Sequence, residues 1–211
     1  MKVGLYFGTF NPIHIGHLVI ANYMATHTDL DEIWLIVSPQ NPLKEKSTLL
    51  DDHHRLDMAF MAVENNDFVK VSNIEFSLAK PSYTTLTLTY LQEKYPENIF
   101  SLIMGEDNIR TFHKWKNYQE IINNHQLYVY PRVEIIEDVN SNIINKSPLT
   151  NLTKEEQKKI TFCNKAPIMK ISASAIRESI KANKSVRYLI PDKLIKYIDD
   201  MNFYKKQNNE F

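Results

Sequence analysis

The sequence predicts an α/β protein in which helices flank a parallel β-sheet and a small C-terminal helical part follows. Residues 2–7 form a short, mostly apolar run with Val and aromatic side chains, which is typical of a buried strand. Residues 14–27 show helical apolar spacing, and a second apolar run follows at 32–38. A strand, a helix and a strand in this order form a βαβ unit, which requires a parallel sheet.

The alternation of strands and helices continues along the chain. Either Asp51 or Asp52 is expected to cap the next helix, and residues 68–71 are expected to form a strand. Residues 83–95 are ambiguous, because their threonines favour a strand whereas their Leu and Tyr spacing favours a helix. We interpret them as a helix, since the apolar strand 98–104 follows directly.

The second half of the chain is less regular. Residues 126–130 are the last central strand that we expect, and residues 134–160 are polar, rich in Asn and weakly periodic. We interpret 134–160 as a variable surface insertion, because strand-like and helical signals resume after it. The predicted organisation is one domain over 1–170 and a C-terminal helical part over 171–205.

Two helices are expected in the C-terminal part. Residues 171–182 show helical spacing behind Ser172 and Ser174, either of which is suited to the first position. Residues 191–201 begin with Pro191, a residue that is common at the start of helices.

The composition excludes several classes of protein. Lys and Arg (25) balance Asp and Glu (25), so no nucleic-acid partner is expected and any phosphate site must be local. The single Cys163 excludes an internal disulfide and a multi-cysteine metal site. The N-terminal apolar run is too short for a secretory signal, and no stretch reaches the length of a membrane span. A cytoplasmic location without a membrane partner is therefore expected.

The four glycines of the chain are placed informatively. Gly8 and Gly105 each follow an apolar strand directly, at the edge where open α/β sheets bind ligands. Glycine allows a close approach of the backbone to a ligand or a positive φ angle. The alternative is that each glycine forms an ordinary turn between a strand and a helix.

Two histidines stand at the start of the first predicted helix, in the segment His14-Ile15-Gly16-His17. Residues three apart share a helix face, so both imidazoles point the same way. Unpaired backbone N–H groups and the positive end of the helix dipole attract an anion at this position. Phosphate charge would favour the protonated imidazole, which donates two hydrogen bonds. Gly16 leaves that approach unobstructed.

The segment GTFNPIHIGH (8–17) resembles the signature of the HxGH nucleotidyltransferase superfamily, whose usual pattern is GGTFDPxHxGH. This resemblance implies a Rossmann-like nucleotidyltransferase fold and transfer of a nucleotidyl group by direct displacement. The chain departs from the pattern at two positions, because Phe7 replaces the first Gly and Asn11 replaces Asp.

Further segments resemble bacterial nicotinate mononucleotide adenylyltransferase along nearly the whole chain. They are NPLKEK (41–46), HRLDMAFMA (54–62), PSYTTLTL (81–88), MGEDN (104–108), FHKWKNYQEI (112–121), ISASAIR (171–177) and VRYLIPDKLIKYI (186–198). The resemblance implies the reaction of ATP with nicotinate mononucleotide to give deamido-NAD and pyrophosphate, in NAD biosynthesis. Only the stretch 134–160 finds no match.

A displacement at phosphorus depends on positioning and on charge stabilisation. We expect His14 and His17 to donate to the α-phosphate, and the backbone amides of Thr9 and Phe10 to add donors. Lys44 is a third catalytic candidate that neutralises phosphate charge; the alternative is a solvated loop lysine. The expected ATP site also includes three glycines, at which the backbone can approach the ligand closely: Gly8, Gly16 and Gly105.

The C-terminal part is expected to complete the ATP site with Ile171, Ser172, Ser174 and Arg177. Serines at a helix start and an Arg one turn on suit pyrophosphate oxygens, although the serines are alternatively plain helix caps. No carboxylate cage is visible, so no protein metal site is expected and ATP phosphates with water should hold Mg²⁺. Asp107 is placed to accept from a ribose, and the resemblance implies the ATP ribose; alternatively it caps the helix that follows.

The second substrate is assigned by the resemblance. It implies that Trp115 stacks on the nicotinate ring and that backbone amides at Thr84 and near Lys116 bind the carboxylate. Ser82 and Tyr83 are weaker candidates for the same site. The alternative for Trp115 is a core side chain.

Four alternatives remain open from sequence. One is a preference for nicotinamide mononucleotide or another small phosphorylated acceptor, and a second is a phosphopantetheine or cytidylyl enzyme. A class I aminoacyl-tRNA synthetase is a third, on the strength of HIGH (14–17) and KISAS (170–174), but the chain lacks the length and basic excess for tRNA. The fourth is an inactive nucleotide-binding module. A homo-oligomer is a possible assembly.

Overall fold

The structure is a computed structural model that describes residues 1–39, 49–80, 82–132 and 149–206. Within these ranges, neighbouring strands all run parallel in one sheet of order β3-β2-β1-β4-β5-β6. The strands are β1 (Lys2–Gly8), β2 (Glu32–Val37), β3 (Val69–Ser72), β4 (Ile99–Gly105), β5 (Leu127–Tyr130) and β6 (Ile160–Phe162). The order reverses between β1 and β4, which is the switch point where such sheets bind ligands.

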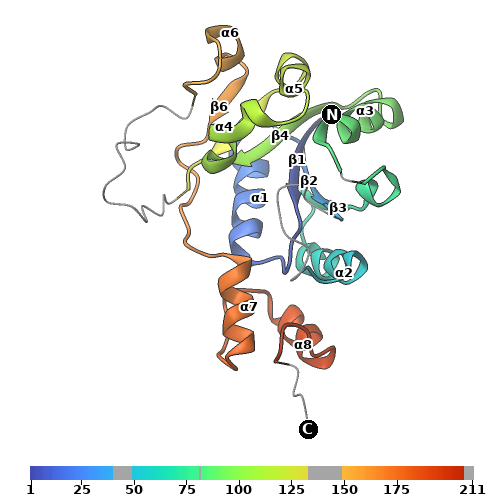
Figure 1. The fold of residues 1–211 in the computed structure, drawn as a ribbon, viewed down its shortest axis with the longest axis vertical. Coiled ribbons are helices and arrows are strands. Elements are labelled where there is room, and N and C mark those ends of the chain that lie inside the picture. The colour runs from blue at the N-terminus through green and yellow to red at the C-terminus, as the bar shows by residue number, and fades with distance from the viewer. Residues whose placement is uncertain (40–48, 81, 133–148, 207–211) are drawn as a thin grey trace.

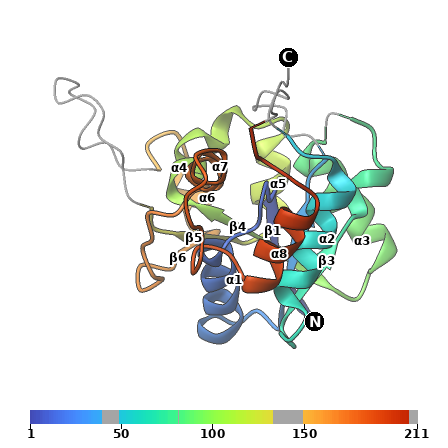
Figure 2. The same cartoon turned by 90° about the horizontal axis from the view of Figure 1, so that it is seen from below.

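Helices cover both faces of the sheet, as parallel strands require (Figure 1, Figure 2). One face packs against α1 (Ile15–His27) and α2 (Asp52–Val63). The other packs against α3 (Thr84–Lys94), α4 (Glu106–Thr111), α5 (Tyr118–Asn124) and the 3₁₀ turns η1 (Ile74–Ser77) and η2 (Phe112–Lys114). Among the described helices, none combines the length and the apolar character of a membrane span.

The side chains of the strands contribute to two separate apolar cores, one on each face of the sheet. Val3 and Leu5 of β1 and Leu102 of β4 belong to the core beneath α3, α4 and α5. Tyr6 of β1 and Ile103 of β4 belong to the core beneath α1 and α2. Successive side chains of a strand point to opposite faces, so a run that is apolar throughout is buried on both sides.

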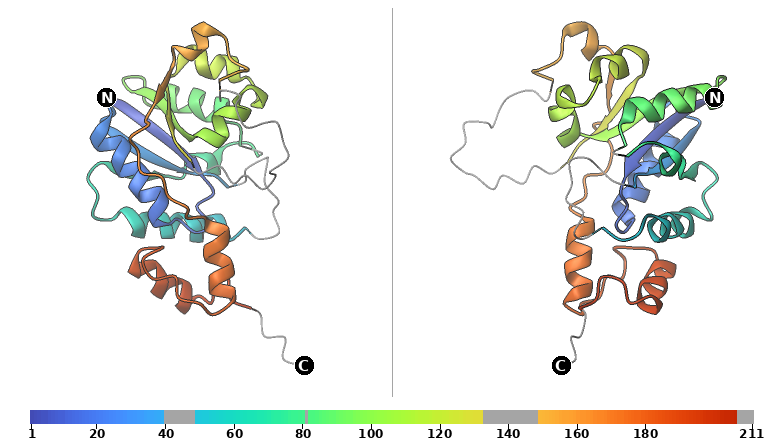
Figure 3. Two further views of the ribbon diagram at one scale, coloured as in Figure 1. Left: turned by 90° about the vertical axis from the view of Figure 1, so that its left-hand side faces the viewer. Right: turned by 45° about the vertical axis from the view of Figure 1, so that its right-hand side comes forward.

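The helices α7 (Ala173–Lys181) and α8 (Asp192–Asp200) lie beyond the carboxyl edge of the sheet (Figure 1, Figure 3). Ser172 caps α7, because its Oγ accepts from the backbone N of Ala175 at 3.2 Å. Pro191 precedes the first residue of α8, as predicted. The backbone N of Ile15 donates to the carbonyl of Leu189 at 2.9 Å, so the C-terminal part is tied to the start of α1.

Two uncertain expectations are decided by the structure. Residues 84–94 form helix α3, which confirms the helical interpretation of that threonine-rich segment. Asp51 rather than Asp52 caps α2, and its Oδ1 accepts from the backbone N of His53 at 2.9 Å.

Two short elements, β6 and α6 (Lys154–Gln157), were missed. Strand β6 adds to the sheet beside β5, and its first residue, Ile160, falls in the segment 134–160 that we interpret as an insertion. The short helix α6 precedes it. A strand of three residues at the edge of a sheet carries no apolar run long enough to detect. The division at residue 170 stays a prediction.

Candidate active site

A cavity of about 400 Å³ opens at the carboxyl edge of the sheet, between the ends of β1 and β4 and the starts of α1 and α7. Its lining contains many of the residues that the sequence analysis selected: Gly8, Thr9, Phe10, His14, His17, Asp107, Trp115, Ser172, Ser174 and Arg177. A larger groove of about 680 Å³ between α1, α2 and α8 contains none of them. Since the smaller cavity also lies at the switch point, it is the candidate active site.

The turn after β1 is held by a buried arginine. Arg55 of α2 is fully buried, and its Nη1 donates to the carbonyl of Thr9 at 2.6 Å and to that of Ser38 at 2.8 Å. The positive φ angle of the turn, 46°, falls at Phe10 and not at a glycine. Gly8 is needed for close approach instead, because an added Cβ would lie 2.8 Å from the Phe10 ring.

The two imidazoles lie together, as predicted, although their backbone positions differ from those of two helical residues. His14 is the N-cap of α1 with an extended backbone, and His17 is the third helical residue. Their ring centroids are 3.7 Å apart and the planes differ by 21°. The backbone N of His14 donates to Nδ1 of His17 at 3.3 Å, so a neutral His17 carries its proton on Nε2. A Cβ at Gly16 would lie 3.0 Å from the His14 ring.

The charge state of His14 depends on its surroundings. Burial and the nearby charge of Arg132 lower the pKa of His14 to about 4. The side chain is almost fully buried, and its Nδ1 has no hydrogen-bond partner in the described part of the chain. The protein's own groups therefore hold this imidazole neutral at pH 7. The protonated form that we expect during catalysis requires the negative charge of a phosphate.

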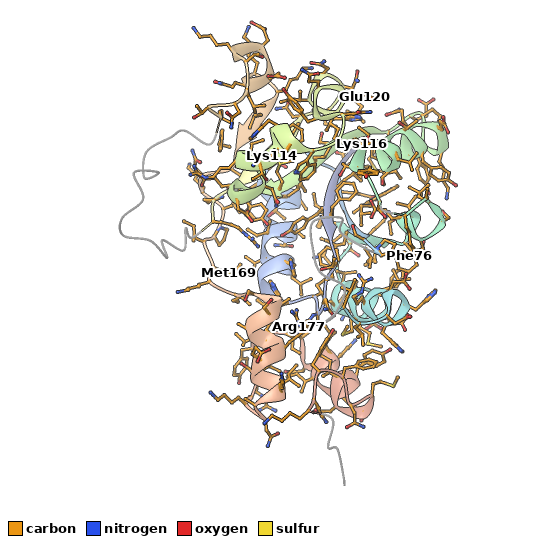
Figure 4. The ribbon with its side chains drawn as sticks, viewed as in Figure 1. Phe76, Lys114, Lys116, Glu120, Met169 and Arg177 are labelled. Atoms are coloured by element: carbon orange, nitrogen blue, oxygen red, sulfur yellow. The ribbon has the colours of Figure 1, made fainter. Side chains whose placement is uncertain are left out.

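Helix α7 is fastened to the turn through Arg177, which lies in the middle of α7 and is labelled beside that helix in Figure 4. Its Nη1 donates to the carbonyl of Asn11 at 2.8 Å, and its Nη2 donates to Oγ of Ser174 at 3.3 Å. Ser172 caps the helix and also lines the cavity, and its contact with pyrophosphate stays a prediction.

Asn11 replaces the usual aspartate without loss of an acceptor. Its Oδ1 accepts from the hydroxyl of Tyr204 at 2.8 Å and from the backbone N of Leu50 at 3.3 Å. Both donors are uncharged, so an amide oxygen satisfies them as a carboxylate would. Tyr204, near the end of the described chain, is a contact of the turn that the sequence analysis missed.

Arg132 is the main residue of the cavity lining that sequence reasoning overlooked. It follows β5 at the carboxyl edge, and its Nη1 lies 3.0 Å from Oδ2 of Asp107. Asp107 is the second residue of α4, whose N-cap is Gly105, so the alternative of Asp107 as a helix cap is wrong. A Cβ at Gly105 would lie 2.4 Å from Oδ1 of Asp107. A charged residue two positions after the apolar strand 127–130 was the available signal.

Trp115 borders both the cavity and the core, and its stacking on a nicotinate ring stays a prediction. It lines the cavity, while its ring contacts Phe112 of the core with centroids 5.4 Å apart. Its Nε1 is buried and has no hydrogen-bond partner among the described residues. An indole that is packed on one side and borders a cavity on the other offers a rigid surface to a flat ring.

The remaining acceptor candidates gather around the start of α3, outside the cavity lining. Tyr83 is the N-cap of α3 and Thr84 its first residue, whereas Ser82 is buried. Lys116 extends beside α3, with its Nζ 4.3 Å from the centre of the Tyr83 ring (Figure 4). Their contact with an acceptor stays a prediction.

Two further expectations concern ATP and metal. Ile171, which precedes α7, packs against the start of α1, because its Cβ lies 3.6 Å from where a Cβ of Gly16 would be. Lys44 lies outside the described residues. Within the described residues, no group of three His, Cys, Asp or Glu side chains could hold a metal ion.

Comparison with known proteins decides the family. The cytidylyltransferase-like family matches residues 5–179. A protein of Flavobacterium johnsoniae, named a probable nicotinate-nucleotide adenylyltransferase, is 54% identical over 206 residues, which cover 98% of this chain and 100% of that protein. A protein of Christiangramia forsetii with the same name is 51% identical over 207 residues, covering 97% and 98%. The chain belongs to the nicotinate-nucleotide adenylyltransferase family.

A solved structure supports the fold independently of sequence. The Plasmodium falciparum nicotinic acid mononucleotide adenylyltransferase complexed with NaAD superposes with a TM-score of 0.72 at 18% identity. The match covers 96% of this chain and 97% of that one. This match confirms the predicted Rossmann-like nucleotidyltransferase fold, and the identity to the full-length relatives confirms the resemblance stated from the motifs. The phosphopantetheine and aminoacyl-tRNA synthetase alternatives are set aside by the full-length family match.

Proposed function

We propose that the protein transfers the adenylyl group of ATP to nicotinate mononucleotide, giving deamido-NAD and pyrophosphate for NAD biosynthesis. The observation that carries this proposal is the pair of stacked imidazoles, His14 and His17, in a cavity at the switch point of the sheet. Family membership supports the same activity, because full-length relatives carry the name of this enzyme.

In the proposed reaction a phosphate oxygen of the mononucleotide attacks the α-phosphorus of ATP. The bond from that phosphorus to the bridging oxygen breaks, and pyrophosphate leaves on the opposite side. His14 and His17 donate to the α-phosphate oxygens, where negative charge builds up, together with the backbone amides of Thr9 and Phe10. Lys44 adds positive charge at the phosphates.

Pyrophosphate oxygens are held by Ser172, Ser174 and Arg177 at the start of α7. Asp107 accepts from the ATP ribose, and Arg132, which already faces Asp107, fixes that carboxylate. Among the described residues, Asp107 is the single carboxylate of the cavity lining, which fits Mg²⁺ held mainly by ATP phosphates and water. The metal supplies neutralisation of phosphate charge when it is bound.

For the acceptor, Trp115 stacks on the nicotinate ring, and backbone amides at Thr84 and near Lys116 bind its carboxylate. Ser82 and Tyr83 shape the same segment. A carboxylate accepts at both oxygens, whereas a carboxamide would place its NH₂ group against an N–H donor. Discrimination between the acid and amide forms therefore follows from this arrangement.

We expect kcat/KM for nicotinate mononucleotide to exceed that for nicotinamide mononucleotide by about tenfold or more, the value of one lost charged hydrogen bond. Pyrophosphate release is measured with each mononucleotide side by side, under equal ATP and Mg²⁺. A preference for the amide would overturn the choice of substrate and leave the reaction type standing. ATP turnover with neither mononucleotide would favour the inactive binding module.

A further inference from the structure

A buried carboxyl group lies outside the cavity lining. Glu75 of η1 is only 2% exposed, and the Thr87 hydroxyl donates to its Oε1 at 2.7 Å. Its Oε2 has no hydrogen-bond partner in the described ranges of the chain. Burial raises the pKa of Glu75, although the hydroxyls of Thr87, Ser38 and Ser82 act in the opposite direction. The Ser82 hydroxyl is buried too, and among the described residues no partner meets it in ordinary hydrogen-bond geometry.

A buried carboxyl group with an unpaired oxygen is energetically unfavourable. An aliphatic side chain of similar size would fill the same space without an unpaired oxygen, and such replacements are often neutral or stabilising. A protonated carboxyl both accepts and donates, so it can hold Thr87 and Ser82 together.

The cluster joins both halves of the proposed active site. The hydroxyl of Ser38 faces Glu75, and the backbone carbonyl of Ser38 accepts a hydrogen bond from Arg55. Arg55 also donates to the carbonyl of Thr9 in the turn after β1. On the other side, Ser82 and Thr87 bracket the start of α3. Figure 4 shows the neighbouring residue of η1, Phe76, between α3 and α2.

We propose that Glu75 is a positioning residue for the acceptor mononucleotide: its carboxyl group fixes Ser82 and Thr87, and thereby the backbone of Tyr83 and Thr84. This inference rests on the proposed function, since that backbone is assigned to the acceptor. Glu75 itself touches no substrate. Loss of the Glu75 carboxyl group loosens the backbone of Tyr83 and Thr84. It leaves the phosphate site at His14 and His17 in place.

The test compares Glu75→Gln, Glu75→Leu and Thr87→Val with the wild-type protein. Gln keeps a neutral group that both donates and accepts, so its acceptor KM should stay within about threefold of wild type. Glu75→Leu leaves the buried Thr87 hydroxyl unpaired, and Thr87→Val leaves the buried Glu75 carboxyl unpaired. In both variants the KM for the acceptor mononucleotide should rise about tenfold or more. The KM for ATP should change less than about twofold. Thr89→Val, at an exposed position of α3, is the matched control and should change neither constant.

Two further readouts separate this inference from its alternatives. Calorimetric Kd values for nicotinate mononucleotide report acceptor binding without turnover, and thermal midpoints report stability. An unchanged acceptor KM and Kd in Glu75→Leu, or equal changes in both substrate constants, would overturn the inference. If the wild-type protein prefers the amide mononucleotide, the proposed substrate fails, and the effect of Glu75→Leu must then fall on the KM of the amide.

Discussion

Replacement of His17 by alanine is expected to lower kcat by about a hundredfold or more, the cost of removing one oriented transition-state donor. The ring of His17 stacks on that of His14 at 3.7 Å between centroids, so its loss also frees the partner ring. The KM for ATP should change less than kcat, because the donor acts where charge develops during the reaction. Steady-state pyrophosphate release measures both constants.

The matched control is His27→Ala, which removes a second histidine from the same helix. His27 is exposed at the last residue of α1 and does not line the cavity, so kcat should stay within about twofold of wild type. His17→Asn, which keeps a side-chain donor, should lie between the wild type and His17→Ala. Near-normal turnover in His17→Ala would remove the central catalytic assignment.

Replacement of Arg55 by methionine is expected to lower the free energy of unfolding by about 3 to 5 kcal/mol, because buried carbonyls lose their donor. Four backbone carbonyls accept from this guanidinium: those of Leu50, Thr9, Ser38 and Pro39. Met preserves most of the apolar stem. The thermal midpoint should fall by roughly 10 °C or more in a chain of this size. Activity should fall as well, since the turn that presents Thr9 loses its support.

Arg187→Met serves as the control for Arg55→Met. Arg187 is exposed, and surface substitutions of this kind usually change stability by less than about 0.5 kcal/mol. Lower activity of Arg55→Met with an unchanged thermal midpoint would mean that Arg55 contacts substrate and does not support the turn.

Most of the fold follows from local sequence patterns. The apolar runs of β1, β2 and β4 are buried on both faces, so their periodicity is unmistakable and their parallel order follows from the helices between them. β6 escaped detection because it is short and lies at the edge, with Thr161 exposed. The Asp51 cap was one of two alternatives that spacing alone leaves equal.

The site was predictable where chemistry is concentrated in one segment. His14, Gly16 and His17 lie within four residues at the start of one helix, so their proximity was predictable, although His14 is the extended N-cap and not a helical residue. Tyr204 reaches the site only through the tertiary fold, and nothing local distinguishes it from a surface residue. Arg132 could have been selected from its place after the apolar strand 127–130, although its contact with Asp107 also depends on the tertiary fold. The low pKa of His14 likewise arises from burial and from Arg132, which the sequence does not place beside it.

The most direct test of the phosphate cradle is the titration of His14 itself. The pKa of His14, about 4 without phosphate, should rise when an ATP analogue with a non-cleavable α,β-bridge binds with Mg²⁺. A raised pKa in the complex means that binding takes up a proton and strengthens as pH falls through that value. NMR of ¹⁵N-labelled histidine follows both rings, with His14→Gln for assignment. We expect the His14 signals to shift towards the protonated form on binding. Tight binding of the analogue with the His14 signals unchanged would contradict the cradle.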